Sequence, residues 1–540
     1  MSGAAPPTEV PSAATLAIRD VTVIPMNGGP NLTHRTVLIS GQQISSIVAA
    51  DAPIPDGVGI IEGDGRFLFP GLVDAHVHLR RADAAQYLAD GVLTVRNMWG
   101  HSGIRPLIAD IERGNVAGPA VVSLSPGIDG SPPQWPETEL LNTPADAEAL
   151  VARLAGAGWK TLKVYQSLSL ASFDAVSAAA KRHGVEFAGH VPTAVPIEHA
   201  LTSGMRSIEH LSGYDRRLSA SHNGGTWGWS DATFTGTDAL LRETVAQNVW
   251  NVPTMAIYRH LAQQHPADMR ARVIGNRRRF VQMLYQAGAH LAAGTDAGID
   301  VIPAAGALEA ELEEFAAAGI PLEEVLAIGT RHGGELLREP GLGTIVAGAP
   351  ARLLLLDGDP TRDLAVLRRA AVIVRDGRIL TRSEGCAGPI SPSTQGGSSV
   401  RARPRVTFVG IAAAAVTSLA CGASAPADAP SVAGTYNTAV SVTSSSEGCS
   451  LPVQNNPTVV QTSNGNSVVM LTHAGTTYGG ELKPDLRFTT QPKTVVAGGV
   501  SYAISITGKF TGSTLDASVT LDYGSAPACH VVVRWLGARE

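Results

Sequence analysis

Apolar and polar positions follow two different rhythms along this chain. Leu16 to Pro25 and Arg35 to Val48 alternate as half-buried strands do. From Pro70 onward, short apolar runs of strand length are separated by stretches with helical spacing, such as Leu170–His183. The runs predicted as strands are Leu72–Leu79, Val92–Met98, Ala120–Ser125, Thr161–Tyr165, Glu186–His190, Ser207–Leu211, Val249–Ile257 and His290–Thr295. Eight strand–helix units over about 260 residues are the usual size of a (β/α)₈ TIM barrel.

Strand-like alternation returns after the predicted barrel, for example at Ala351–Leu356 and Ala371–Arg375. We expect these strands to complete the small sheet begun by the N-terminal region. The predicted α/β architecture is therefore a barrel over 70–334 with a small β-sandwich domain built from 14–69 and 335–382.

The remainder of the chain differs in composition. Residues 383–404 are rich in Ser, Pro and Gly and indicate a linker. Residues 405–421 are an apolar run that follows arginines and ends at Cys421, which is typical of a bacterial lipoprotein signal. A buried Ala-rich helix is the alternative interpretation. Residues 432–540 alternate in short strands, which predicts a small all-β domain in which Cys449 and Cys529 could form a disulfide.

A signal-like segment in the middle of a chain has two explanations. It is either an internal membrane tether for an exported domain or the mark of two joined reading frames. Residues 1–385 contain no cysteine and begin without an apolar leader, so we expect this part to be cytoplasmic. The C-terminal domain would be exported or membrane-anchored if 405–421 acts as a signal.

Charge excludes one class of partner. The 540 residues carry a formal charge of -6, and only 16% of them are charged. Such a mild acidic balance gives no sign of a nucleic-acid surface. A small-molecule substrate is the partner that we expect for the barrel.

Candidate chemistry begins at His76 and His78, in the first predicted barrel strand. Side chains alternate between the faces of a strand, so both imidazoles project from one side and could hold one metal ion. A pair of core histidines is the ordinary alternative, because His-x-His alone is a weak signal.

Four further residues stand at the ends of other predicted strands, where barrels carry their chemistry. Lys163 has the parity of the barrel interior, and a free buried cation there would be costly. His190 and His210 end two successive strands, and Asp296 ends the last one. Singly, the histidines could be structural and Asp296 a helix cap. Their joint occurrence at strand ends predicts a metal site.

These motifs resemble the metal-dependent amidohydrolase superfamily. Over roughly 16–381, the chain is most similar to the imidazolonepropionase- and prolidase-like branch. The motifs that carry the resemblance are Pro70-Gly-Leu-Val-Asp-Ala-His76-Val-His78, Lys163-Val-Tyr, Gly189-His190-Val-Pro, Ser207-Ile-Glu-His210-Leu and Ala293-Gly-Thr-Asp296.

The resemblance implies two divalent metal ions. His76, His78 and Asp296 would bind the first ion, and His190 and His210 the second. Lys163 would be carboxylated and bridge both ions. Imidazole and oxygen ligands suit zinc without excluding manganese, iron or cobalt. An unmodified Lys163 would leave a mononuclear site instead.

The resemblance also implies a reaction. A metal-activated hydroxide would attack a carbonyl, and Asp296 would act as the catalytic general acid/base. The predicted substrate is an amide, cyclic amide or dipeptide-like compound; the alternative is an ester, lactone or phosphotriester. A non-catalytic binding protein on a decayed scaffold is a third hypothesis, which the presence of all six ligands argues against.

Substrate contacts are predicted less sharply. Tyr165, Arg96, His101 and Tyr258 lie near strand ends or mouth loops and are candidates. Prolidase-like members often carry Ser-Gly-Gly after the lysine, whereas this chain has Gln166-Ser-Leu-Ser-Leu, so Xaa-Pro activity does not follow. The loops Ser212–Asp238 and Trp99–Trp135 are expected to shape the substrate pocket.

Overall fold

The structure is a computed structural model that divides the chain into two compact units, 1–421 and 422–540. It describes 14–382 except 132, 136, 223, 300 and 301, together with 417–419. In the second unit it describes 432, 434–446, 456–463, 468–473, 476–497, 500–523 and 529–539.

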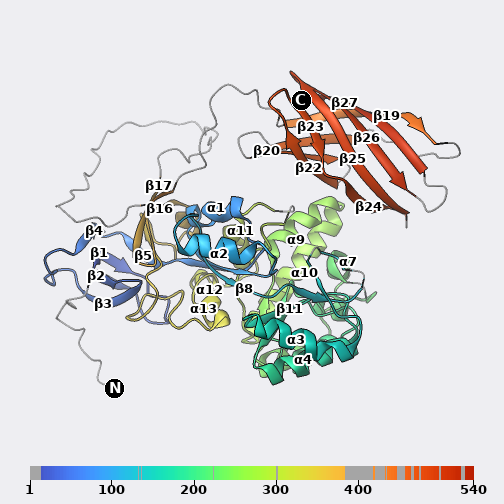
Figure 1. Ribbon diagram of the computed structural model, residues 1–540. Helices are drawn as coiled ribbons and strands as arrows, with labels where there is room; N and C mark the ends of the chain where they lie inside the picture. The colour runs from blue at the N-terminus through green and yellow to red at the C-terminus, as the bar shows by residue number, and fades with distance from the viewer. Residues whose placement is uncertain are drawn as a thin grey trace. The chain divides into compact units, whose positions relative to one another are not determined.

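One sheet of the first unit combines strands from both ends of the unit (Figure 1). Its order is β18-β17-β16-β15-β5-β1-β2-β3, with β4 beside β1. The N-terminal members are β1 (Leu16–Val23), β2 (Leu32–Ser40), β3 (Gln43–Ala49), β4 (Gly59–Glu62) and β5 (Phe67–Pro70). The later members are β15 (Leu353–Leu356), β16 (Ala370–Arg375), β17 (Arg378–Arg382) and β18 (Thr417–Leu419). The predicted pairing of the N-terminal and post-barrel segments is thus confirmed.

Strand β5 leads through Gly71 directly into the first strand of a parallel system. One arc of that system is β6 (Leu72–Val77), β7 (Val92–Asn97) and β8 (Ala120–Ser123). The other arc has the order β10-β9-β11-β12-β13-β14. Its members are β9 (Gly127–Asp129), β10 (Glu139–Leu140), β11 (Thr161–Val164), β12 (Glu186–Gly189), β13 (Ser207–Glu209) and β14 (Trp250–Val252).

Backbone hydrogen bonds join the two arcs at both ends. Ser125 N–H donates to Thr161 O over 3.1 Å, beyond the end of β8. On the other side, Ala292 N–H donates to Asn251 O over 3.1 Å, and Ala75 N–H donates to Ala293 O over 2.8 Å. The parallel strands therefore form a ring, and their carboxyl ends face one common opening.

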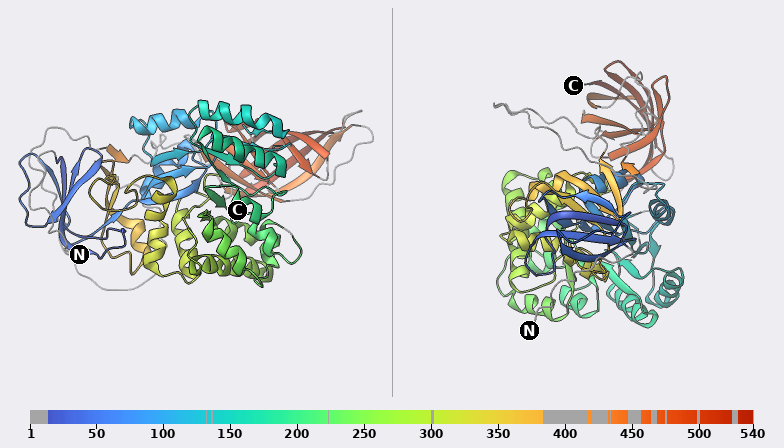
Figure 2. Two further views of the ribbon diagram at one scale, coloured as in Figure 1. Left: turned by 90° about the horizontal axis from the view of Figure 1, so that it is seen from below. Right: turned by 90° about the vertical axis from the view of Figure 1, so that its left-hand side faces the viewer.

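Helices lie around the outside of this ring (Figures 1 and 2). They are α1 (Ala84–Ala89), α2 (Ile104–Glu112), α3 (Ala147–Gly156), α4 (Leu170–His183), α5 (Ile197–Thr202), α6 (Tyr214–Leu218), α7 (Gly225–Ser230), α8 (Asp238–Ala246), α9 (Met255–Leu261), α10 (Ala267–Gln286), α11 (Ala307–Ala317), α12 (Leu322–Ile328) and α13 (Arg331–Leu337). Helix α4 illustrates how the sequence determines where a helix begins and ends. Ser169 Oγ accepts from Ser172 N–H at its start, and Gly184 ends it at φ 62°.

Two of the predicted barrel strands were wrong in extent. Val249–Ile257 is a strand only over Trp250–Val252, because Thr254 turns the chain at φ 50° and α9 begins at Met255. His290–Thr295 is not a regular strand: it makes a single bridge, between Leu291 and Asn251, besides its hydrogen bonds to β6. The loop predicted over Ser212–Asp238 contains the short helices α6 and α7.

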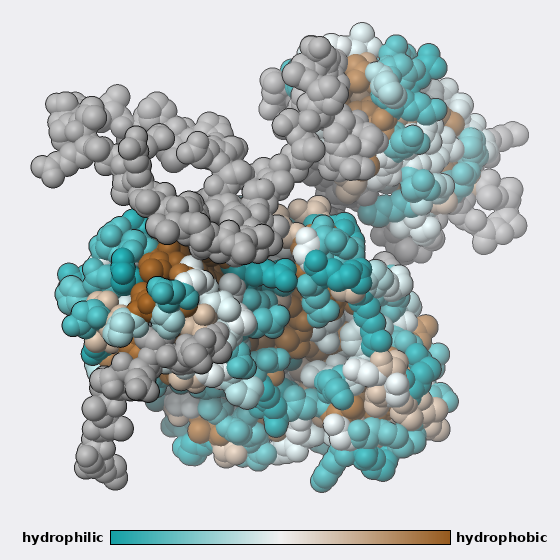
Figure 3. All heavy atoms as spheres, turned by 60° about the vertical axis from the view of Figure 1, so that its left-hand side comes forward, coloured by the Kyte–Doolittle hydropathy of each residue, from teal (hydrophilic) through white to brown (hydrophobic). Residues whose placement is uncertain are grey.

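The core of the first unit lies between the ring and its helices, where apolar side chains such as Leu162, Phe173 and Phe280 are buried. On the face seen in Figure 3, hydrophobic residues form small patches among hydrophilic ones. Among the residues that the structure describes, no helix is long and apolar enough to cross a bilayer.

The second unit contains a separate antiparallel sheet of order β23-β22-β21-β20-β19-β27-β26-β25-β24, and β23 also pairs with β25. The strands are β19 (Gly434–Ser445), β20 (Asn456–Ser463), β21 (Val468–His473), β22 (Thr476–Leu482), β23 (Arg487–Thr490), β24 (Lys493–Ala497), β25 (Val500–Thr511), β26 (Thr514–Tyr523) and β27 (Cys529–Arg539). Alternate residues such as Tyr436, Phe510 and Trp535 fill its core. The predicted separate all-β part is confirmed.

Several predictions fall on residues outside the described ranges. They include the linker 383–404, most of the signal-like segment 405–421, and Cys449. Three residues of the apolar segment are described, and they form β18 beside β17. Cys529 is disulfide-bonded, while its predicted partner Cys449 lies outside the described residues.

Candidate metal centre

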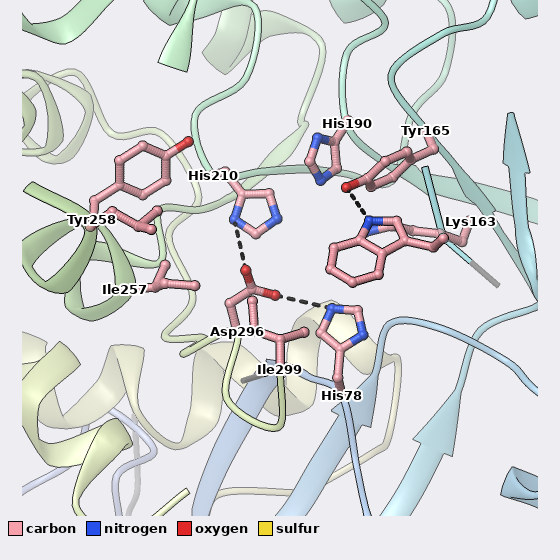
Figure 4. Close-up of a pocket in the computed structure, with 11 residues that line it drawn as sticks. His78, Lys163, Tyr165, His190, His210, Ile257, Tyr258, Asp296 and Ile299 are labelled. Carbon is pink, nitrogen blue, oxygen red and sulfur yellow. Dashed lines mark hydrogen bonds and ion pairs between the residues drawn. The ribbon is translucent and has the colours of Figure 1, made fainter. Parts of the chain in front are cut away.

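Histidines from separate strands meet at the carboxyl end of the ring. His76 lies on β6 and His78 follows it, while His190 and His210 directly follow β12 and β13. The ring centroids of His76 and His210 are 4.5 Å apart, and those of His190 and His210 are 4.6 Å apart. His78 is 5.6 Å from His76 by the same measure. The four predicted histidine ligands therefore form one continuous cluster, and Figure 4 shows three of them, His78, His190 and His210.

Asp296 is the carboxylate of this cluster. Its Oδ1 lies 3.0 Å from Nε2 of both His76 and His78, and its Oδ2 lies 3.9 Å from His210 Nδ1. Burial alone would raise the pKa of Asp296, but His210 and His76 hold it well below the usual value. The side chain is therefore an anion among imidazoles.

Close backbone approach brings Asp296 to the histidines. A Cβ at Gly294 would lie 2.7 Å from His76 Cβ, so only glycine lets this segment pack on β6. Asp296 itself has φ 61°, and His210 has φ 63°. Non-glycine residues in the left-handed region are strained, and such strain is concentrated at functional sites.

Lys163 is buried at 1% exposure on β11, as its parity predicted. Its backbone N–H donates to Ser125 Oγ over 3.1 Å, which ties β11 to the end of β8. Burial lowers the pKa of Lys163 to about 8. Its Nζ lies 6.0 Å from the centre of the Tyr165 ring, which in turn lies 4.3 Å from the His190 ring. Lys163 and His190 thus both lie near the Tyr165 ring and line the same cavity.

A buried carboxylate that the sequence analysis missed supports the first histidine. Glu209 Oε2 is 2.7 Å from His76 Nδ1, and its Oε1 accepts from Arg96 Nη1 over 3.2 Å. Ser207 Oγ donates to the same Oε1 and accepts from Arg96 Nη1 over 3.0 Å. Burial would raise the pKa of Glu209, but Arg96 and His76 bring it to about 2. Arg96 therefore belongs to a buried ion pair and is not among the residues that line the pocket. Its prediction as a substrate contact had assumed a position in the pocket lining.

Two more supporting residues were also missed. Asp74 Oδ2 accepts from Thr295 Oγ1 over 2.7 Å, and its Oδ1 accepts from His76 N–H over 3.2 Å. Thr254 Oγ1 lies 2.8 Å from His210 Nδ1. The Thr254 contact is of the kind that metal-binding histidines commonly make with their second ring nitrogen, and such a contact fixes the tautomer and the ring orientation.

The donor atoms fit a divalent metal ion. Ligand atoms of His76, His210 and Asp296 lie within 4.8 Å of one another. His76 Nε2 and Asp296 Oδ1 are buried and have no hydrogen-bond partner, although the two atoms are 3.0 Å apart. Unpartnered buried polar atoms are rare and costly. A cation between them would satisfy both, and imidazole with carboxylate suits zinc and related ions.

Two of the four predicted substrate contacts line the cavity in front of this cluster. Tyr165 and Tyr258 are among the lining residues of a cavity of about 150 Å³. Burial raises the pKa of each phenol to about 12. His101 is not among the lining residues; its Nδ1 accepts from Gly103 N–H over 3.1 Å beside the start of α2.

Known proteins share sequence and fold with this chain. The model of the Amidohydrolase family matches residues 67–380. Adenine deaminase 2 of Rhizobium etli is 25% identical over 402 residues, which are 68% of this chain and 58% of that protein. The chain thus spans less than two thirds of that relative's length.

Solved structures show the same fold. A putative prolidase from Bifidobacterium longum is 21% identical with a TM-score of 0.57, over 68% of this chain and 95% of that one. The ochratoxinase of A. niger is 18% identical with a TM-score of 0.54, over 67% of this chain and 95% of that one.

Proposed function

Because the chain belongs to the amidohydrolase family, whose enzymes act on carbon–nitrogen bonds, we propose that it is a metal-dependent hydrolase of amides, cyclic amides or dipeptide-like compounds. One observation carries this proposal: His76 Nε2 and Asp296 Oδ1 are buried without hydrogen-bond partners inside a cluster of metal-ligand geometry. We take the ring of parallel strands as a (β/α)₈ barrel in which 290–295 stands in the place of the eighth strand.

His76, His78 and Asp296 would hold one ion, and His190 and His210 would hold a second. Lys163, carboxylated on Nζ, would be the bridging ligand. The low pKa of its buried amine supports this assignment, because only the unprotonated amine can add to carbon dioxide. Carboxylation would also replace a costly buried cation by an anion.

Divalent ions at these ligands would acidify a water molecule and polarise the scissile carbonyl. Asp296 is the residue that we assign as general acid/base: its carboxylate accepts the proton of the water and returns it to the leaving amine. Glu209 holds His76 from behind, and Thr254 does the same for His210. These contacts fix the orientation of the two imidazoles.

Metal content tests the proposal. We expect about two zinc ions per full-length chain by elemental analysis, falling to about one in Lys163→Ala. Lys160→Ala, at an exposed position three residues earlier, is the matched control and should keep both ions. The preparation with two ions should hydrolyse members of an amide panel.

Other outcomes are informative. One ion in both the wild type and Lys163→Ala would make the site mononuclear. No metal in any preparation would exclude the mechanism. Hydrolysis of esters, lactones or phosphotriesters without amides would favour the alternative substrate class, which the same ligands could serve.

A further inference from the structure

The part of the cavity away from the metal ligands is lined by apolar and aromatic side chains. They come from three places in the fold: the stretch between β9 and β10, the end of β11, and the elements around α9. These residues are Trp135, Tyr165, Ile257, Tyr258, Leu261 and Ile299. In Figure 4, Tyr258 and Ile257 lie on the other side of His210 and Asp296 from Tyr165.

Trp135 and Tyr165 form the first wall. Trp135 Nε1 donates to Tyr165 Oη over 2.6 Å, so the polar atom of the indole is already paired. The Tyr165 ring is held edge-on by Trp99, with ring centroids 5.4 Å apart. Trp135 nevertheless remains 43% exposed. What it offers to the cavity and to water is therefore an apolar ring surface, which is costly to leave uncovered.

The second wall consists of α9 and Ile299. The guanidinium of Arg277 lies 3.6 Å from the centre of the Tyr258 ring. That guanidinium donates to the carbonyl oxygens of His210, over 3.2 Å, and Pro253, over 2.5 Å. Its charge is thus committed to the backbone and to the tyrosine ring, and Arg277 is not among the lining residues.

Charges on a substrate would find few partners at these walls. Among the described lining residues, Lys163 is the only lysine or arginine and Asp296 the only carboxylate, and both belong to the metal cluster. The undescribed positions between 14 and 382 are Pro132, Pro136, Asn223, Asp300 and Val301, so none of them adds a cation that could pair with an anionic group, and Asp300 is the one carboxylate among them. Burying a charged group against the walls without a partner would be costly.

We propose that the cavity selects substrates with an uncharged aromatic or branched aliphatic group beside the scissile bond, and that Trp135 determines this specificity. The group would lie between the Trp135–Tyr165 wall and the α9 wall. This inference rests on the proposed function and narrows it: a compound with an anionic group at that position would be a poor substrate.

Binding tests the proposal separately from catalysis. The ligands are N-acetylphenylalaninamide, N-acetylalaninamide and the α-amide of N-acetylglutamate, which differ in the side group alone. Calorimetric titration of the full-length protein should give the tightest binding for the phenylalanine compound, by about tenfold or more. Trp135→Ala should remove most of that preference. Trp159→Ala, a half-buried tryptophan under Arg105 outside the cavity, should leave it unchanged.

Each result decides something. Equal or tighter binding of the alanine or glutamate compound, or no binding of any of them, would overturn the proposal. So would equal effects of Trp135→Ala and Trp159→Ala. If binding follows the expected order but metal-loaded protein releases no amine from any amide, the specificity stands and the proposed hydrolysis fails.

Discussion

Glu209 Oε2 lies 2.7 Å from His76 Nδ1, and both side chains are completely buried. A buried carboxylate behind a ligand histidine fixes the ring so that the other nitrogen faces the ion. Here that nitrogen, Nε2, is one of the two unpartnered atoms of the cluster. Glu209 therefore orients His76 for the proposed metal ion.

Glu209→Gln should weaken metal binding by about ten- to a hundredfold, because the amide holds His76 less firmly than the carboxylate does. Competition with a chelator of known zinc affinity measures the change. Arg96 loses its buried partner, so the folded state should also be destabilised by about 3–5 kcal/mol. Glu198→Gln, in an exposed pair with Arg217, is the control. Unchanged zinc affinity in Glu209→Gln would contradict the assigned role.

Thr254→Val should lower zinc affinity as well, because it removes the hydroxyl that lies 2.8 Å from His210 Nδ1 and keeps the shape of the side chain. Thr254→Ser retains the hydroxyl and should keep most of the affinity. The same chelator titration compares the two variants. Equal losses in both would mean that packing at this strained position matters more than the hydrogen bond.

Asp296→Asn should lower kcat on any amide substrate by about 10²- to 10⁴-fold, the usual contribution of general acid–base catalysis. The amide keeps the size of the side chain but cannot take up the proton. Metal content is measured on the same samples, so that loss of metal and loss of proton transfer can be separated. Asp174→Asn, at an exposed site beside His199, serves for comparison. A metal-loaded Asp296→Asn enzyme with normal kcat would contradict the assignment of Asp296 as general acid/base.

Glu311 gives a pH prediction away from the metal ligands. Its Oε2 accepts from Ala256 N–H over 2.7 Å in the first turn of α9, and burial raises its pKa to about 8. The folded state therefore holds a proton that the unfolded chain releases above its ordinary carboxyl pKa of about 4.5. The stabilisation is complete below that pH and is lost as pH rises toward about 8.

Glu311→Gln should match the wild type in thermal unfolding near pH 5 and unfold at a higher temperature than the wild type near pH 8. The helical signal in circular dichroism reports the unfolding of the first unit, because the described helices lie in that unit. Glu313→Gln, on the exposed side of the same helix, should unfold at the same temperature as the wild type at both pH values. A wild-type-like pH dependence in Glu311→Gln would refute the prediction.

Strand parity explains why residues of the cluster could be predicted. His76, His78 and Lys163 stand at inward positions of apolar strands, and each lies where its parity places it. The same rule could have found Glu209, because Ile208 faces outward between Ser207 and Glu209. The sequence around Glu209 does not indicate its role, because its partner Arg96 lies on β7, more than a hundred residues earlier in the chain.

Parity fails where the backbone leaves the regular strand. Thr254 at φ 50° ends a run that reads as one apolar strand through Ile257, so the wall formed by α9 could not be foreseen. An apolar run alone does not distinguish a strand from a buried helix. Trp135 was likewise only the boundary of a loop, because the hydrogen bond that joins it to Tyr165 depends on the path of the chain between β9 and β10.

The position of β5 has a consequence for synthesis of the chain. Phe67–Pro70 lies between β1, which precedes it, and β15, in which Leu353 pairs with Pro70. Until Leu353–Leu356 leaves the ribosome, one edge of β5 has no partner, even though the ring strands have already been made. Such an edge can pair with other chains. Nascent or truncated forms that stop before residue 353 should therefore depend on chaperones, whereas forms that extend past β17 should not.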